Sequence, residues 1–206
     1  VSKVVFSSSG GTVYGPVERT PIPEDHPTNP ITSYGIQKLA IEKYLALFGH
    51  LHGLDWTALR PSNPYGERQD PHSVQGAVGV FANLIKEGKP IAIWGDGSVV
   101  RDYVYVKDVV EAFAWFADKS ARSRIFNIGS GVGTDLNRLV ELMSRISGLG
   151  AVVNYQPARR VDIPVNVLDI TRARDELGWS PKVGLAEGLK RLFEEKGCSC
   201  ECESAS

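Results

Sequence analysis

Short apolar runs alternate with helix-like segments along this chain, and this alternation constrains the fold more than any other feature. Three of the runs have the composition of strands buried in a parallel sheet, and they are Val4–Ser7, Leu54–Arg60 and Arg124–Gly129. Segments with helical periodicity separate them, at 34–51, 78–87 and 135–147. Strands that alternate with helices predict an α/β fold built on a parallel sheet.

The middle of the chain has a different pattern. We expect a strand at Ile91–Trp94, a hairpin turn at Gly95-Asp96-Gly97-Ser98 and a returning strand at Val99–Val106. Further helices are expected at 108–117, with Asp108 as the N-cap, and at 169–177 and 185–195. The hairpin and these helices predict a smaller α+β lobe beside the parallel sheet.

Composition excludes several classes of protein. The 206 residues are 42% hydrophobic and carry a net charge of −1, which gives no strong field for nucleic acid or an anionic membrane. No apolar run approaches the roughly 20 residues of a membrane-spanning helix, and no signal peptide opens the sequence. The cysteines, Cys198, Cys200 and Cys202, lie together near the end. This placement excludes a disulfide framework and predicts a reducing, cytoplasmic location. The histidines are scattered, so no metal site is predicted.

Tyr34 and Lys38 are four residues apart in the helix predicted after Ser33, with Thr32 or Ser33 as N-cap. This spacing places both side chains on one helical face. A free phenol titrates near about 10, and a cation held close to it lowers that pKa toward the range of a useful general base. The same spacing occurs by chance in many helices, so the pair indicates chemistry only together with its surroundings.

The helix at 34–51 is apolar on two sides. One stripe contains Ile36, Ala40, Tyr44, Leu47 and Leu51, and a second contains Ile41, Leu45 and Phe48. A helix with two apolar sides is buried on two sides. We therefore expect one side to cover the sheet and the other to pack against the same helix of a second subunit, as a homodimer.

Loops at the carboxyl ends of the predicted strands are the expected ligand sites. Ser7-Ser8-Ser9-Gly10-Gly11 follows the first strand and Pro61–Gly66 follows the second. The glycines at 129–133 do not have the spacing of a dinucleotide fingerprint, and no such fingerprint occurs in the chain. Arg101 either forms a surface pair with Asp102 or clamps a diphosphate with its planar fork.

Together, these motifs resemble the NAD-dependent epimerase/dehydratase family of extended short-chain dehydrogenase/reductases, over about Val1 to Phe193. The matching motifs are Thr12-Val13-Tyr14-Gly15, Tyr34-Gly35-Ile36-Gln37-Lys38, Arg60–Gly66, Gly95–Ser98, Arg101–Val106, Phe126–Gly129 and Glu176–Pro181. The resemblance implies NAD as cofactor and a UDP-sugar as substrate. It also implies epimerisation of the UDP-glucose/UDP-galactose type through a transient 4-keto sugar.

The resemblance also implies roles for particular residues. Tyr34 is the base, Lys38 lowers its pKa, and a serine hydroxyl binds the reacting oxygen. Counting from the strand gives Ser9 for this serine, with Ser8 as second choice, whereas counting back from Thr12-Val13-Tyr14-Gly15 gives Gly10. The expected NAD contacts are Ser8, Tyr34, Lys38 and Pro61. The expected substrate contacts are Asn63, Arg101, Asp162 and either Arg159 or Arg160.

Two departures from the family pattern qualify this reading. Gly11 and Thr12 occupy the positions of the Asp and Glu used by dehydratases, which argues against dehydration. The glycine-rich NAD loop and the first sheet strands, about 100 residues by βαβ length, are absent from this sequence. The alternatives are therefore an inactive truncated homologue that keeps at most sugar-nucleotide binding, or a nucleotide-sugar 4-reductase.

The expected domain organisation follows from the same resemblance. Residues 1–62 and 100–130 form the C-terminal part of a Rossmann-type sheet. Residues 63–99 and 131–196 form the nucleotide-sugar-binding lobe, and 197–206 form a disordered tail.

Overall fold

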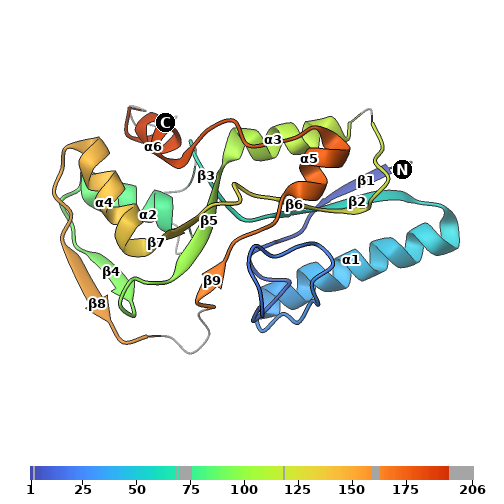
Figure 1. Ribbon diagram of the computed structural model, residues 1–206, viewed down its shortest axis with the longest axis horizontal. Coiled ribbons are helices and arrows are strands. Elements are labelled where there is room, and N and C mark those ends of the chain that lie inside the picture. Colours follow the sequence, from blue (N-terminus) through green and yellow to red (C-terminus); the bar gives the residue numbers. More distant parts are fainter. Residues whose placement is uncertain (2, 68, 70–75, 118, 159–162, 195–206) are drawn as a thin grey trace, which may run out of the picture.

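A computed structural model describes residues 1, 3–67, 69, 76–117, 119–158 and 163–194. The fold is α/β, as predicted. Figure 1 shows one portion built on β1, β2 and β6, with α1 on one side of the sheet and α3 and α5 on the other. The remaining helices and strands form a second portion, which contains a core of its own.

The first portion contains a parallel sheet in the order β1-β2-β6. Its strands are β1 (Lys3–Ser7), β2 (Asp55–Pro61) and β6 (Ile125–Ile128). Helices α3 (Val106–Trp115) and α5 (Thr171–Leu177) cover one face. Leu59 and Phe126 of the sheet pack there with Phe116 at the end of α3 and with Leu177. Burial of these large apolar side chains, at about 1.5–3 kcal/mol each, holds this layer together.

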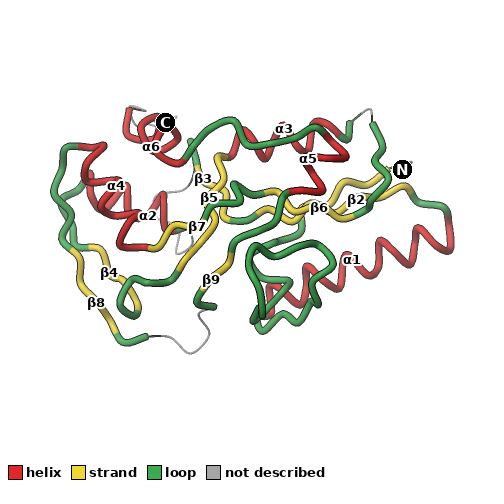
Figure 2. Tube along the Cα trace, viewed as in Figure 1, coloured by secondary structure: helices red, strands yellow, loops and turns green. Residues whose placement is uncertain are grey.

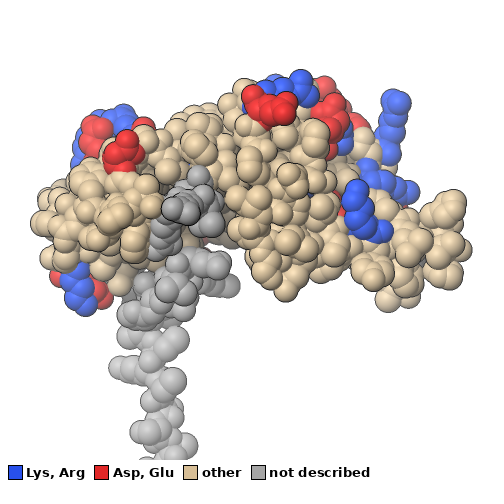
Figure 3. Space-filling model, turned by 90° about the horizontal axis from the view of Figure 1, so that it is seen from below, with Lys and Arg blue, Asp and Glu red and all other residues tan. Residues whose placement is uncertain are grey.

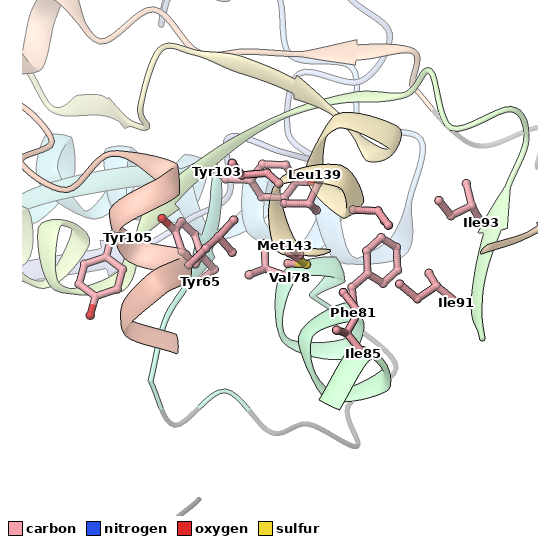
Figure 4. Packing of buried hydrophobic residues seen from close by; sticks show 13 residues of the cluster. Tyr65, Val78, Phe81, Ile85, Ile91, Ile93, Tyr103, Tyr105, Leu139 and Met143 are labelled. Carbon is pink, nitrogen blue, oxygen red and sulfur yellow. The ribbon is translucent and has the colours of Figure 1, made fainter. Parts of the chain in front are cut away.

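The second portion is organised around β5 (Val100–Tyr105). This strand pairs in parallel with β3 (Asn63–Tyr65) and β9 (Val165–Asn166), and antiparallel with β7 (Gly133–Asp135). Helices α2 (Ala77–Lys86), α4 (Leu136–Ser147) and α6 (Leu185–Glu194) belong to the same portion. Figure 4 shows their shared core, in which Phe81 and Ile85 of α2 lie beside Met143 of α4.

The predicted hairpin at 91–106 is wrong. Strand β4 (Ile91–Trp94) pairs in parallel with β8 (Val153–Gln156), and β5 belongs to another sheet. The turn at 95–98 docks on α4 instead, because the Gly97 carbonyl oxygen accepts a hydrogen bond of 3.0 Å from the Leu136 amide. Strand β5 therefore pairs with β3, β7 and β9 and not with β4. The division into domains at the predicted boundaries stays a prediction.

The loop between β1 and α1 is tied to the segment at β9 (Val165–Asn166) and just after it. Figure 2 shows this loop beside β9. The Ile22 amide donates to the Val167 carbonyl oxygen over 2.8 Å, and the Asp169 amide donates to the Ile22 carbonyl oxygen over 2.9 Å. Asn166 adds a bond of 3.2 Å from its side-chain amide to the Gly10 carbonyl oxygen. The loop is therefore completed by residues from the far end of the sequence.

Of the two N-cap candidates of α1, Thr32 and Ser33, the structure confirms Thr32. Thr32 caps α1 (Ser33–His52), accepting a hydrogen bond from the Gly35 amide, and Asp135 caps α4 by accepting one from Arg138. The predicted cap at Asp108 is wrong, because α3 already begins at Val106. The Asp108 carboxylate is buried instead and accepts a hydrogen bond from the Val183 amide.

The packing of α1 differs from the expectation. The buried residues of this helix are Gly35 and Glu42, and Leu45 is the one half-buried member of the two apolar stripes. Ile36, Ile41, Tyr44, Leu47, Phe48 and Leu51 are all exposed. Figure 3 views the molecule from the α1 side, where most of the surface is uncharged and basic side chains are scattered. Among the described residues, no helix combines the length and apolar character needed to cross a bilayer.

Candidate active site

Tyr34 and Lys38 lie on one face at the start of α1, as their spacing predicts. The Lys38 ammonium lies 5.3 Å from the centroid of the Tyr34 ring and 5.0 Å from that of Phe6 on β1. It also donates a hydrogen bond of 2.8 Å to the Ser7 carbonyl oxygen, at the end of β1. The Tyr34 side chain is 52% exposed, so its phenol is accessible to a substrate.

Gly35 brings the start of α1 close to the serine loop. A Cβ atom at this position would lie 2.7 Å from the Thr12 carbonyl oxygen and 2.9 Å from Pro30. Any larger residue would push the helix away from the loop. The glycine inside the Tyr34–Lys38 motif therefore sets the distance between the two predicted catalytic elements.

The hydroxyl groups of the adjacent serines Ser8 and Ser9 differ in their hydrogen bonding. The buried Ser8 hydroxyl donates to the carboxylate of Glu42. The Ser9 carbonyl oxygen accepts a hydrogen bond of 3.2 Å from the Val13 amide. Within the described residues, no bond to the Ser9 hydroxyl is formed. Ser9 therefore has the hydroxyl that is available to a ligand, whereas the hydroxyl of Ser8 is already engaged.

A buried polar network lies beneath this loop and was not foreseen from the sequence. Arg60 on β2 forms a two-bond ion pair with Glu42, and both residues are 2% exposed. Arg60 also donates to the Tyr14 hydroxyl over 2.9 Å, and that hydroxyl donates to Asn127 over 2.6 Å. Burial raises the pKa of Tyr14 to about 12, so its phenol stays protonated. The available signal was Glu42 itself, a charged residue seven positions after Gly35 and so on the same helical face.

The second predicted loop leads from this site to a cavity. Pro61, the last residue of β2, is buried, and its carbonyl oxygen accepts a bond of 2.8 Å from the Gly10 amide. Asn63, two residues later, lines a cavity of about 470 Å³. Only one residue, Ser62, therefore separates Pro61, which bonds to the serine loop, from Asn63 at the cavity.

The cavity combines a cation with apolar walls. Its lining includes Arg101, Tyr103, Phe81 and Trp94. Arg101 donates to the Ile163 carbonyl oxygen over 2.7 Å, and Asn63 donates to the Asp102 carbonyl oxygen over 3.0 Å. These contacts fix one cationic and one amide side chain at the cavity wall. Such a wall suits an anionic ligand with an apolar ring.

The prediction that Arg101 forms a surface ion pair with Asp102 is wrong, because Asp102 is fully buried. Its carboxylate accepts hydrogen bonds from Ser130, from the Gly131 amide and from the Leu168 amide. Burial raises the pKa of Asp102, and the bonds from Ser130 oppose that shift. Asp102 therefore ties β5 to the glycine-containing turn after β6, as an internal anchor.

The remaining predicted substrate residues, Arg159, Arg160 and Asp162, lie outside the described residues. The part of the chain that the structure describes brings no group of three or more His, Cys, Asp or Glu side chains into a metal-binding arrangement.

Comparison with known proteins assigns these features to a family. The model of the NAD dependent epimerase/dehydratase family matches residues 1–129. The UDP-glucose 4-epimerase of Mycolicibacterium smegmatis is 42% identical over 194 residues, which are 94% of this chain and 62% of that protein. The chain thus spans about 62% of the length of the curated relatives it matches.

Solved structures give the same result. The crystal structure of a UDP-glucose 4-epimerase from Thermotoga maritima with UDP-glucose has 45% sequence identity and a TM-score of 0.90, covering 94% of this chain and 63% of that one. The UDP-glucose 4-epimerase of Thermus thermophilus in complex with NAD has 37% identity and a TM-score of 0.87, with the same coverage. The fold is thus that of these Rossmann-type enzymes over nearly the whole chain.

Proposed function

We propose, because the chain belongs to the NAD dependent epimerase/dehydratase family, that it carries the reaction residues and the sugar-nucleotide pocket of an NAD-dependent UDP-sugar 4-epimerase. The observation that supports this most is that Tyr34 and Lys38, at the start of α1, adjoin the loop that carries Ser9, through Lys38 at Ser7 and Gly35 at Thr12. The loop after β2 connects this point to the cavity that contains Arg101.

In this proposal, Tyr34 is the general base. Its phenolate takes the proton from the sugar 4-hydroxyl and returns a proton when the hydroxyl is formed again on the other face of the sugar. The Lys38 ammonium lies 5.3 Å from the Tyr34 ring and favours the negative charge that the phenolate carries. The Ser9 hydroxyl binds the reacting oxygen and orients it toward Tyr34. Positioning of this kind accounts for a large share of the rate in such reactions.

NAD, when bound, accepts a hydride from C4 of the sugar and gives it back, so no cofactor is consumed. The residues at hand suit its nicotinamide end: a fixed ammonium at Lys38, an exposed phenol at Tyr34 and the wall formed at Pro61. Ser62 and Thr12 add buried hydroxyls that have no hydrogen-bond partner among the described residues. We place the rest of the NAD site in the part of the family's length that this chain does not span.

The cavity at Asn63 and Arg101 is the proposed site of the nucleoside diphosphate. The forked guanidinium of Arg101 matches phosphate oxygens, and the apolar side chains of Phe81 and Trp94 suit the base. The volume of about 470 Å³ lies within the range of small-molecule sites. Arg159 and Asp162 are proposed to complete this site from the segment outside the described residues.

A homodimer through α1 is also proposed. The apolar stripes of this helix are exposed, and contiguous exposed apolar surface of this kind marks an interface. A cytoplasmic location is proposed from the placement of the cysteines at 198, 200 and 202 alone.

The experiment that tests the function measures bound NAD and the interconversion of UDP-glucose and UDP-galactose by the purified protein. In a protein that joins this chain to the rest of the NAD site, we expect bound NAD and interconversion without net consumption of cofactor. Stoichiometric consumption of NADPH would point to a reductase instead. A protein that binds UDP but neither holds NAD nor interconverts the sugars would overturn the enzymatic proposal for this chain.

A further inference from the structure

One face of α1 holds the serine loop at three points. Gly35 lies against the Thr12 carbonyl oxygen, Lys38 donates to the Ser7 carbonyl oxygen, and Glu42 accepts a bond from the Ser8 hydroxyl. The spacing of i, i+3 and i+7 places these helix residues in one stripe. All three contacts fall on the segment from Ser7 to Thr12, and within it Ser9 keeps its hydroxyl for a ligand.

The third contact is itself held from the sheet side. Arg60 donates from Nε and Nη2 to the two carboxylate oxygens of Glu42, over 3.0 and 2.6 Å. Two parallel bonds fix the plane of the carboxylate as well as its distance. The Tyr14 hydroxyl, 2.9 Å from Nη1 of Arg60, holds the guanidinium in turn. The orientation of Glu42 toward Ser8 is thereby set by β2 and by the loop before α1.

This ion pair is a costly way to attach a helix. Removing two charges from water offsets most of their attraction, and apolar replacements of similar volume are often neutral or stabilising. Most residues of the apolar stripes of α1 are exposed, and on its inward side Leu39 packs against the buried cluster that contains Tyr14. The ion pair adds a polar anchor of fixed geometry to this limited apolar packing.

We propose that Glu42 is a positioning residue for the proposed reaction. By holding the Ser8 hydroxyl against the ion pair with Arg60, it fixes the position of the next residue, Ser9, in the loop that Lys38 contacts at Ser7. This inference rests on the proposed function for its catalytic consequence. The geometry of the loop can be tested without it.

The kinetic test uses two variants and a matched control. Ser8→Ala removes the hydroxyl but leaves the ion pair intact. The double variant Glu42→Leu/Arg60→Met removes the charges together and so avoids an unpaired buried charge. Ser123→Ala is the control, because the Ser123 hydroxyl also donates to a glutamate, Glu176, outside the site.

We expect Ser8→Ala and the double variant to lower kcat by roughly a hundredfold, as for displacement of a catalytic group by about 1 Å. The KM for the UDP-sugar should stay within about twofold, because the cavity at Arg101 makes no use of Glu42. The control should keep the wild-type kcat. A double variant that is folded, with the melting temperature and kcat of the wild type, would overturn the proposal.

Amide hydrogen exchange provides the readout that is independent of activity. The Val13 amide is bonded to the Ser9 carbonyl oxygen, so its exchange reports whether the loop keeps its shape. We expect Ser8→Ala to speed exchange at Val13 by roughly tenfold, and Ser123→Ala to leave it unchanged. Unchanged exchange in Ser8→Ala would overturn the positioning role. A wild-type protein without epimerase activity would overturn the proposed function while this readout still decides the role of Glu42.

Discussion

The ammonium of Lys38 lies 5.3 Å from the ring centroid of Tyr34, one helical turn away on α1. Its bond of 2.8 Å to the Ser7 carbonyl oxygen keeps it there without neutralising its charge. A carbonyl partner orients the cation and leaves it able to act on the phenol, which a carboxylate partner would not. The backbone at the end of β1 therefore fixes the position of the ammonium beside the Tyr34 ring.

Tyr34→Phe should abolish most of the proposed activity while leaving the fold intact. The change removes the oxygen that transfers the proton, and general acid–base catalysis contributes about 10²–10⁴-fold to rates. The Tyr34 side chain is half-exposed, so the melting temperature of the variant should match that of the wild type. Rates of UDP-glucose/UDP-galactose interconversion measure the effect. Tyr155→Phe, at an exposed tyrosine on β8, is the control, and an active Tyr34→Phe would remove Tyr34 from the mechanism.

Arg101→Lys should weaken substrate binding more than catalysis. A lysine keeps the charge but loses the planar fork that matches a diphosphate. We expect the KM for UDP-glucose to rise roughly tenfold, which corresponds to about 1.4 kcal/mol, with kcat nearly unchanged. Steady-state kinetics with Arg145→Lys, an exposed position on α4, as control measures this. An unchanged KM would place the diphosphate elsewhere.

Gly129→Ala should destabilise the fold. A Cβ atom there would lie 2.4 Å from a carboxylate oxygen of the buried Asp102 and 3.3 Å from the Ser62 hydroxyl oxygen. Overpacking of this kind costs about 1–3 kcal/mol in the free energy of unfolding. Urea unfolding should show that loss. Gly150→Ala, where a Cβ atom meets nothing within 4 Å, should stay within about 0.5 kcal/mol of the wild type.

Glu67 should make stability depend on acid pH. A hydrogen bond from the Tyr105 hydroxyl, with a second from Lys107, lowers the pKa of Glu67 from 4.5 to about 2. Because the folded pKa lies below the unfolded one, the stabilisation is present above pH 4.5 and is lost as the pH falls toward 2. Glu67→Gln should therefore lose less stability than the wild type over this window in thermal melts. An equal loss of stability in both proteins would contradict the lowered pKa of Glu67. Glu18→Gln, at an exposed glutamate, is the charge-matched control.

Leu47→Glu should dissociate the proposed dimer. Leu47 is 45% exposed and lies in an apolar stripe of α1, where a charge would be left without solvent in a helix–helix interface. Analytical ultracentrifugation should show the dimer dissociation constant rising at least roughly tenfold. Val132→Glu, at an apolar residue that is 64% exposed and outside α1, should leave association unchanged. Monomeric wild-type protein would exclude the dimer.

Features with local causes were predictable from the sequence. The caps at Thr32 and Asp135, with the helices that follow them, depend on side chains within three residues of the cap. The spacing of Tyr34 and Lys38 likewise needs only the pitch of one helix. The choice of Ser9 over Ser8 stays a prediction, and the bond from the Ser8 hydroxyl to Glu42 was not foreseen.

Features with distant causes were not predictable in the same way. Strand β4 carries the residues and the turn of a hairpin, yet its partner β8 begins at Val153, far beyond the strand that follows the turn. The inward face of α1 carries Glu42, which pairs with Arg60 on β2, whereas most residues of the apolar stripes are exposed. Apolar periodicity predicts which face of a helix is buried, but a buried ion pair can place a different face inward.

The bonds between the loop after β1 and the residues at 166–169 set an order of events during synthesis. A nascent chain that ends at β8 already contains Tyr34, Lys38 and Ser9, but it cannot form the bonds from Asn166 to Gly10 or between Ile22 and Val167. The loop after β1 thus leaves the ribosome well before the residues at 166–169 that complete it. Until Asp169 has emerged, this loop remains open to chaperones and proteases.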